Sequence, residues 1–205
     1  MEYNTETEKK ILAAATEVFI QKGKDGARMD EIARKAGLNK ALLHYYFRSK
    51  ERLYSHVFSS EVRCFFHAFL DSIPISENIE NFLHGFIGNY IEHLRKNPRI
   101  IRFILWEIGH GGQMFVEVVS EVFSESESKT PHSFIKKIEQ AVQEKKIRPL
   151  DPLHLLLSMI GMSIFVFIAQ PLVESIFSGV QVTDSAFIEK RKDEIFQLIW
   201  QGVHP

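Results

Sequence analysis

The sequence predicts an all-α protein of about nine helices, and three observations support that prediction. Apolar residues recur at helical spacing along most of the chain, whereas the alternation typical of strands is weak. Capping residues and prolines mark several helix starts, and glycines mark several ends. The 205 residues are 45% hydrophobic and 25% charged, a composition that suffices for one sizeable core or two modest ones.

The N-terminal third of the chain contains four predicted helices. The first ends near Gly23 and carries one apolar stripe, formed by Ile11, Leu12, Ala15, Val18 and Phe19. Two short apolar patterns follow, separated by Gly37. A longer helix begins after Ser49 and ends before Pro74, with its apolar side chains at Leu53, Val57, Phe58, Val62, Phe65, Phe66 and Phe69.

Three later helices are expected to begin at a capping residue followed by proline, at Asn97-Pro98, Thr130-Pro131 and Asp151-Pro152. The side-chain oxygen of the first residue can accept an otherwise unpaired backbone N–H, and proline has no N–H to leave unpaired there. The polar segments 124–129 and 179–185 are expected to be loops. The last two helices are predicted at about 152–172 and 184–202.

Basic residues are concentrated near the N-terminus, although the whole chain has a net charge of −1. Residues 22–52 carry 9 Lys and Arg against 4 Asp and Glu. A basic segment on a faintly acidic chain can face the phosphates of nucleic acid. Chance clustering on a solvated surface gives the same counts, so charge alone does not decide between the two readings.

The sequence favours a cytoplasmic protein that makes no contact with a membrane. The single cysteine, Cys64, excludes an internal disulfide framework and suits a reducing compartment, and its apolar surroundings predict a buried side chain. The polar N-terminus predicts that no signal peptide is present. The apolar stretch 153–177 is interrupted by polar residues, whereas a membrane span needs about 20 continuous apolar residues. We therefore expect this stretch to form a buried helix.

Residues 29–47 have the pattern of a helix-turn-helix, in which two short helices meet at a tight turn. Ala33 is the small residue required where the helices cross, and Gly37 supplies a residue that tolerates positive φ. Asn39 can cap the second helix. The inward positions are Ile32, Ala36, Leu38, Leu43 and Tyr46, and the outward ones are Lys40, Ala41, His44 and Tyr45. Such an outward face suits a DNA major groove, although the same join also occurs in ordinary helical bundles.

This stretch resembles the TetR family of bacterial regulators, whose DNA-binding signature runs approximately D-E-I-A-x-x-A-G-V-S-K-G-T-L-Y-x-Y-F-x-S-K-E-x-L. The matching residues are Asp30-Glu31-Ile32-Ala33, Ala36-Gly37-Leu38-Asn39-Lys40, Leu43-His44-Tyr45-Tyr46-Phe47, and Ser49-Lys50-Glu51 with Leu53. The similarity covers roughly residues 8–55. It implies a DNA-binding domain at residues 1–48 and a domain for ligand binding and dimerisation at residues 49–205.

The resemblance implies a role in DNA binding for nine residues of the N-terminal part of the chain, which we call the head (residues 1–52). Lys40 and Tyr45 would meet the groove and phosphates, Lys50 would meet a phosphate, and Arg28 would meet a phosphate or a base edge. Tyr46 would be mainly structural, with a hydroxyl that could reach a phosphate. The full set is Arg28, Asn39, Lys40, Ala41, Leu42, His44, Tyr45, Tyr46 and Lys50. Ala41-Leu42 replaces the usual Gly-Thr pair and His44 replaces the usual tyrosine, so the base that His44 reads cannot be taken from the family.

The resemblance also implies that the central helices bind a small molecule and that the last two helices pair with those of a second copy. Aromatic side chains at helical spacing suit an apolar ligand, although a packed core has the same pattern. The expected ligand residues are Phe65, Phe66, Phe69, Phe86, Tyr90, Phe103 and Trp106. The expected dimer residues are Leu156, Ile160, Ile164, Phe167, Ile188, Ile195 and Ile199.

The sequence therefore predicts a ligand-responsive transcription regulator, most often a repressor in this family, that binds a palindromic double-stranded DNA operator as a homodimer. The nine histidines show no metal-ligand spacing, and we find no pairing of nucleophile and base. We accordingly expect no metal, cofactor or enzymatic activity. The alternative is a helical carrier or enzyme that keeps a helix-turn-helix only as scaffold, and salt-dependent DNA binding would distinguish the two.

Overall fold

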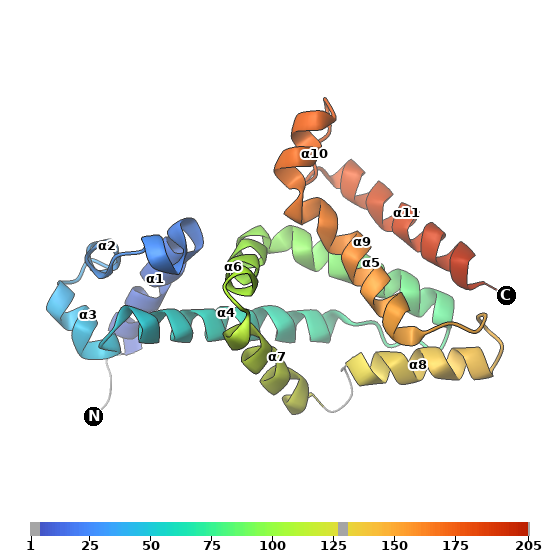
Figure 1. Cartoon of the computed structure of the whole chain (residues 1–205), viewed down its shortest axis with the longest axis horizontal. Helices are drawn as coiled ribbons and strands as arrows, with labels where there is room; N and C mark the ends of the chain where they lie inside the picture. Colours follow the sequence, from blue (N-terminus) through green and yellow to red (C-terminus); the bar gives the residue numbers. More distant parts are fainter. Residues whose placement is uncertain (1–4, 127–130, 205) are drawn as a thin grey trace. The chain divides into compact units, whose positions relative to one another are not determined.

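The computed structural model describes residues 5–126 and 131–204, and within these ranges it contains helices and no strands (Figure 1). The eleven helices there are α1 (Thr5–Gly26), α2 (Met29–Lys35), α3 (Lys40–Phe47), α4 (Lys50–Ser72), α5 (Ile79–Lys96), α6 (Pro98–Gly109), α7 (Gln113–Glu125), α8 (Pro131–Gln143), α9 (Pro152–Ile168), α10 (Gln170–Ile176) and α11 (Ser185–Val203). The predicted all-α class is confirmed, with two more helices than the nine expected.

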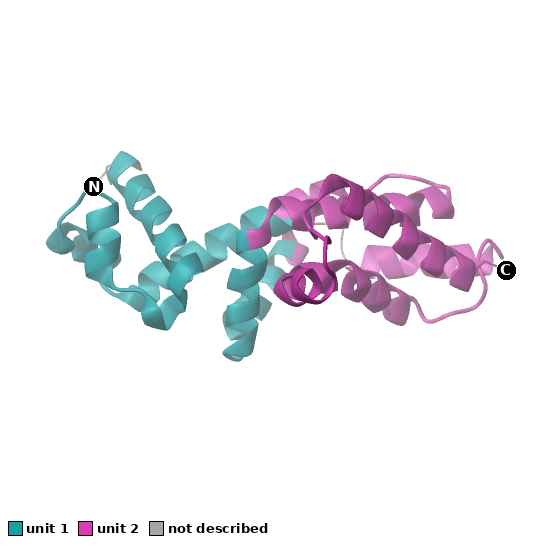
Figure 2. Ribbon diagram, turned by 90° about the horizontal axis from the view of Figure 1, so that it is seen from above, with its two compact units in different colours: residues 1–66, 99–122 teal, residues 67–98, 123–205 magenta. Residues whose placement is uncertain are grey.

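The chain forms two compact units (Figure 2). The first contains the described residues up to Phe66 together with Arg99–Val122, and the second contains His67–Pro98 together with the described residues from Phe123 onward. Helices α6 and α7 therefore pack with the N-terminal helices. The functional division at residue 48 remains a prediction.

In the first unit, α1, α4 and α6 share an aromatic core. The buried Tyr54 ring of α4 meets Phe19 of α1 at 5.1 Å and Phe103 of α6 at 5.5 Å, measured between ring centroids. The Tyr54 hydroxyl donates to the buried Glu107 carboxylate at 3.0 Å. Burial and this carboxylate raise the pKa of Tyr54. The core thus ties the start of α4 to α6 by apolar contact and by one buried hydrogen bond.

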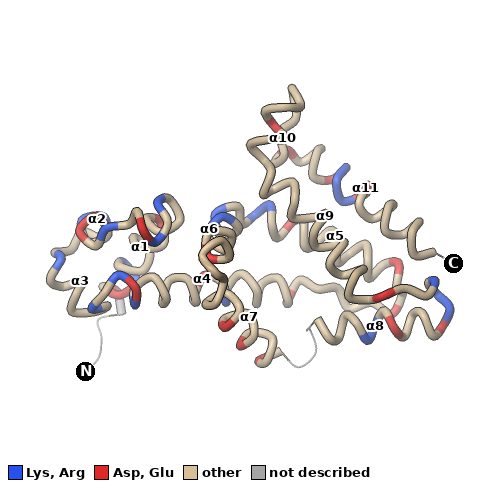
Figure 3. Tube along the Cα trace, in the orientation of Figure 1, with Lys and Arg blue, Asp and Glu red and all other residues tan. Residues whose placement is uncertain are grey.

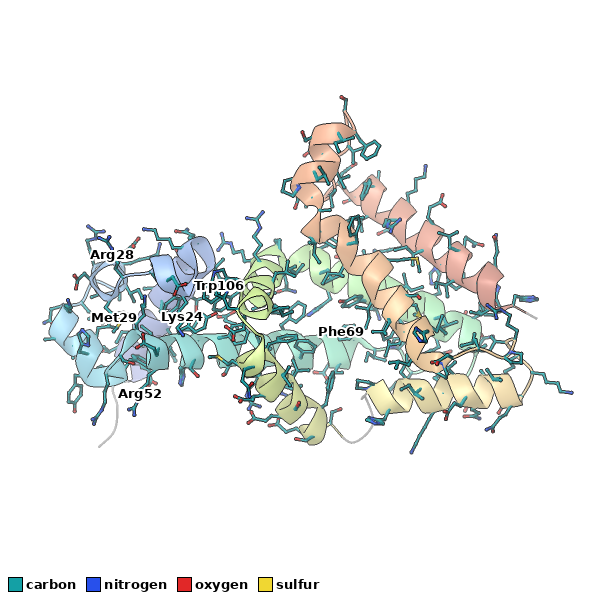
Figure 4. The ribbon with its side chains drawn as sticks, viewed as in Figure 1. Lys24, Arg28, Met29, Arg52, Phe69 and Trp106 are labelled. Carbon is teal, nitrogen blue, oxygen red and sulfur yellow. The ribbon has the colours of Figure 1, made fainter. Side chains whose placement is uncertain are left out.

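Gly23 is required where α1 meets α6. Its φ of +68° is in the left-handed region, and a Cβ placed on it would lie 2.8 Å from the indole nitrogen of Trp106. Figure 4 shows the Trp106 side chain directed from α6 toward the end of α1, near Lys24. Only glycine satisfies both the backbone conformation and this close approach.

The second unit has its core between α5, α8, α9 and α11. Helix α5 contributes one continuous apolar face to this core. Its buried residues recur at intervals of three and four: Ile79, Phe82, Leu83, Phe86, Ile87, Tyr90, Ile91 and Leu94. Asn78 caps this helix by accepting from the backbone N–H of Asn81 at 2.9 Å. The expected cap at Asp151 is confirmed, since its carboxylate accepts from the N–H groups of Leu153 and His154.

Three expectations from the sequence are wrong. Asn97 does not cap α6, because its side-chain amide donates to the His93 carbonyl at the end of α5. Cys64 is exposed, although Val62 and Phe65 beside it are buried. The single helix expected at 152–172 is broken at Ala169 into α9 and α10. The expected cap at Thr130 lies outside the described residues.

Helices α9 and α10 also bear on the membrane question. Within the described residues, no single helix is both long and apolar enough to cross a membrane. These two meet that length and composition only when taken together, and a bend of 67° separates them.

Candidate DNA interface

The turn between α2 and α3 is built by a recognisable set of backbone hydrogen bonds. The N–H of Gly37 donates to the Arg34 carbonyl at 3.1 Å, and that of Leu38 donates to the Ala33 carbonyl at 2.9 Å. This pairing is the Schellman motif, which requires a left-handed residue after the helix. Gly37 has a φ of +71° and meets that requirement. The predicted helix-turn-helix is confirmed at this turn.

The inward faces of α2 and α3 hold the two helices together. Ile32, Ala33 and Leu43 are almost completely buried, and Phe47 closes the far end of α3. Asn39 is the N-cap of α3, with its side-chain oxygen accepting from the N–H of Leu42 at 2.8 Å. That oxygen is therefore engaged within the protein, and Asn39 acts first as a structural residue.

The outward face of α3 is a single stripe. Lys40, Ala41, His44 and Tyr45 are all exposed, and Tyr45 has 64% of its surface accessible. Arg48, the C-cap residue directly after the helix, is also exposed. Leu42 and Tyr46 are half-buried on the flanks, so they contribute to packing as well as to the surface. The structure thus brings the predicted recognition residues together on one helical face.

Further basic residues lie on the segments that precede α2 and follow α3. Arg28 is exposed directly before α2, and Arg52 is exposed in the first turn of α4 (Figure 4). Lys50 lies at the start of α4, where its ammonium donates to the backbone carbonyls of Asp25 at 3.4 Å and Ala27 at 3.3 Å. Two of its three N–H donors are used in this way, which holds the positive charge at the junction between α1 and α2.

Other cations of the head are paired with carboxylates. The ammonium of Lys40 lies 2.9 Å from the Asp30 carboxylate, and both side chains are more than half exposed. Lys22 binds Glu31 and Lys35 binds Glu17, each at 2.6 Å. These partners lower the pKa of Glu31 and of Glu17. Of these three lysines, only Lys40 lies on the outward face of α3.

Sequence reasoning missed Arg48 and Arg52. Within the described part of the chain, neither guanidinium forms an ion pair, and both side chains are exposed. The signal for Arg48 was present, because it lies four residues after His44 and eight after Lys40, at the spacing of one helical face. The head therefore offers more basic groups for phosphate contact than the nine predicted residues include.

The residues predicted to bind a ligand fall into separate clusters. In the second unit, the ring of Phe69 lies 5.8 Å from Phe86 and 5.0 Å from Tyr90. Burial raises the pKa of Tyr90. In the first unit, Phe103 and Trp106 both pack on Tyr54.

The other two predicted ligand residues, Phe65 and Phe66, are also in the first unit. The two rings contact each other at 5.5 Å, and Phe66 lies 5.9 Å from Phe115. The structure therefore brings together only Phe69, Phe86 and Tyr90 as one aromatic cluster in the second unit.

The residues predicted to form the dimer are largely occupied inside their own chain. Four are buried in the core of the second unit: Leu156, Ile188, Ile195 and Ile199. Ile160 and Phe167 pack against that core and Ile164 is half-buried. The exposed apolar residues of α9 are Leu153, Leu157, Phe165 and Ile168.

The comparisons with known proteins agree with this geometry. Residues 11–57 match the family model described as "Bacterial regulatory proteins, tetR family", and residues 80–199 match "Tetracyclin repressor-like, C-terminal domain". The chain is similar to the HTH-type transcriptional regulator RutR of Escherichia coli strain K12, with 28% identity over 203 residues, covering 96% of this chain and 90% of RutR.

Two further relatives extend the comparison. The uncharacterized HTH-type transcriptional regulator YhgD of Bacillus subtilis strain 168 is 30% identical over 149 residues, covering 70% of this chain and 73% of YhgD. The structure of the flavonoid-responsive regulator FrrA shares the fold, with a TM-score of 0.59, 20% identity and coverage of 99% of both chains. The chain therefore belongs to the TetR family of bacterial transcriptional regulators, with a DNA-binding helix-turn-helix at its N-terminus.

Proposed function

We propose that the protein is a repressor that binds a palindromic operator as a homodimer and is released from it by a small apolar or amphipathic molecule. The observation that carries the DNA-binding part is the outward stripe of α3, which is exposed and mixed polar and aromatic, with basic residues on the flanking segments of the chain. An α-helix with such a face fits the major groove, and cations on either side fix its position on the phosphates.

The homodimer is supported by an uncovered apolar face on α9. Leu153, Leu157, Phe165 and Ile168 share this face with Gly161, which is also exposed. Helix α9 carries no Lys, Arg, Asp or Glu (Figure 3). Exposed apolar residues in one helical stripe favour a protein partner, and a glycine within the stripe permits close approach of a second helix. Leu198 on the adjoining α11 is 60% exposed and would extend this face.

The effector would bind against the aromatic cluster of Phe69, Phe86 and Tyr90. Apolar side chains with one hydroxyl suit an amphipathic or aromatic molecule. FrrA, which shares the fold, is described as flavonoid-responsive. Release from DNA requires that the effector bind more tightly to the conformation that does not fit the operator.

The experiment is selection of binding sites from randomised duplexes by the purified full-length protein. Two equivalent reading heads are expected to select an inverted repeat whose half-sites lie about one helical turn apart or a multiple of it. A thermal-shift screen then supplies effector candidates, each tested for loss of operator binding. Selection of a single half-site bound by one chain contradicts the homodimer, and the absence of any selected sequence contradicts the regulator as a whole.

A further inference from the structure

His44 occupies the middle of the recognition stripe. The exposed residues of this face lie at intervals that bring them onto one side of the helix: Lys40, Ala41, His44 and Tyr45. Arg48 follows directly after the helix and is also exposed. His44 thus has one basic residue a turn before it and another a turn after it. A side chain in this position faces the same groove as its neighbours when α3 binds DNA.

The His44 ring is held by a backbone carbonyl at the end of α3. Its Nδ1 lies 3.1 Å from the carbonyl oxygen of Arg48. A carbonyl oxygen can only accept a hydrogen bond, so Nδ1 is the nitrogen that carries the hydrogen. In the neutral ring the other nitrogen, Nε2, then has a lone pair and no hydrogen.

The turn after α3 places this carbonyl beside the ring. Arg48 has a φ of +56° and a ψ of −46°, and the N–H of Ser49 donates to the Phe47 carbonyl at 2.5 Å. These values correspond to the γ-turn with positive φ at its central residue, which is strained and is rare for a residue other than glycine. A non-glycine residue at positive φ persists only where its surroundings hold it there. The ring of His44 is one of those surroundings.

We infer that His44 determines base specificity at one position of each half-site, with Nε2 accepting a hydrogen bond from the exocyclic amine of the base pair at that position. Each base pair presents one exocyclic amine in the major groove, N6 of adenine or N4 of cytosine, and the place of that amine in the groove differs between A·T, T·A, G·C and C·G. An acceptor held in one place therefore favours the pair whose amine lies opposite it. This inference rests on the proposed binding of α3 in the major groove.

The neighbouring side chains would read the opposite type of group. Lys40 and Arg48 carry only donors, which match the O6 and N7 acceptors of guanine. Ala41 offers a methyl group that suits the methyl of thymine. A phenylalanine at residue 44 would not reproduce an acceptor between two donors, because its ring carries no hydrogen-bonding atom.

The first test measures the ring itself without DNA. Long-range ¹H–¹⁵N NMR correlation on the full-length protein, in mildly alkaline buffer where histidine rings are neutral, distinguishes a hydrogen on Nδ1 from one on Nε2. The His44 signals are identified by their loss in His44→Phe. A hydrogen on Nδ1 supports the inference, and a hydrogen on Nε2 overturns it.

The second test repeats the selection from randomised duplexes with three proteins. The wild type is expected to enrich one base pair at one position per half-site, His44→Phe to lose the preference at that position alone, and His44→Arg, which carries only donors, to change it. Tyr45→Phe, on the same face, is the matched control and should leave that position unchanged. Thermal melting confirms that each variant is folded.

The outcomes separate this inference from the proposed function. If the wild type selects an inverted repeat but His44→Phe selects the same bases at every position, the proposed role of His44 is wrong. The proposed function as a DNA-binding regulator is then unaffected. If an analogue that lacks the exocyclic amine replaces the adenine or cytosine of the selected pair and the wild type binds that duplex as tightly as before, the acceptor is wrong. If the wild type selects no sequence, both the proposed function and the role of His44 are overturned.

Discussion

The ion pair between Lys40 and Asp30 leads to a prediction that runs against the usual effect of a mutation: Asp30→Asn should tighten DNA binding. In the unbound protein, the Lys40 ammonium lies 2.9 Å from the Asp30 carboxylate, with side chains 57% and 68% exposed. A phosphate or guanine must compete with that carboxylate for Lys40. Removing the carboxylate removes the competition.

The magnitude follows from the exposure of the pair. Exposed ion pairs contribute about 0.2–1 kcal/mol, so the affinity should rise about 1.4- to 5-fold at physiological salt. The gain should shrink as salt is added, because screening weakens the pair in the unbound protein as well. Asp30 also lies in the first turn of α2, where a negative charge stabilises the helix by about 0.3–1 kcal/mol, so the variant should melt slightly earlier than the wild type.

The assay is a fluorescence-anisotropy titration of a labelled operator at several salt concentrations, well below the melting temperature. The matched control is Glu17→Gln, which breaks the exposed ion pair with Lys35 and removes the same charge from the head. Lys35 does not lie on the recognition stripe. The reasoning is contradicted if Asp30→Asn binds DNA no more tightly than the wild type, or if Glu17→Gln gains as much affinity. In either case the Asp30 carboxylate does not restrain DNA binding by Lys40.

Three further substitutions test the packing and the charges. Gly23→Ala should cost more than about 1 kcal/mol of unfolding free energy, because it adds contact with Trp106 to the penalty of positive φ; denaturation in urea measures it. Tyr54→Phe should cost about 1.5–3 kcal/mol in the same assay, since it leaves the buried Glu107 carboxylate without its donor. Glu92→Gln should cost about 1 kcal/mol at neutral pH, because cationic neighbours, Arg95 first, lower the pKa of Glu92 from 4.5 to about 2. That stabilisation is present above pH 4.5 and lost as the pH falls toward 2, so the difference between the two proteins should disappear over that range.

Each of these has a matched control. Gly37→Ala has nearly the same φ but no atom within 4 Å of the added carbon, so a loss as large as that of Gly23→Ala would show that Trp106 adds nothing. Tyr45→Phe removes an exposed hydroxyl and should leave stability unchanged. Glu189→Gln removes an exposed partner of Lys192, and a pH dependence equal to that of Glu92→Gln would contradict the role of the cations around Glu92.

The helix-turn-helix was predictable because its determinants are local. Gly37 must adopt positive φ, Asn39 must cap, and both requirements can be read from neighbouring residues. The break at Ala169 was also visible in the sequence: Pro171 lacks an N–H and its ring clashes with the preceding turn, so a helix cannot continue through it unbroken.

The exposure of Cys64 and the burial of Ile188 and Ile195 were not predictable in this way. Periodicity gives the angular position of a residue on its helix, but it does not reveal where the packing partner ends or whether the partner belongs to the same chain. An apolar excess on α9 and α11 therefore indicated burial correctly without showing which residues the core would use. The exposed stripe on α9 became visible only once the core was known.

Binding of the operator as a function of salt tests the central claim most directly. The claim is that the outward face of α3 reads DNA sequence while the surrounding cations bind phosphates. The selected duplex should be bound at least about 1,000-fold more tightly than a scrambled duplex at physiological salt. The logarithm of the binding constant should fall linearly with the logarithm of salt concentration, by about 0.9 for each phosphate contacted. Equal affinity for the two duplexes, or an affinity that does not change with salt, would contradict the account.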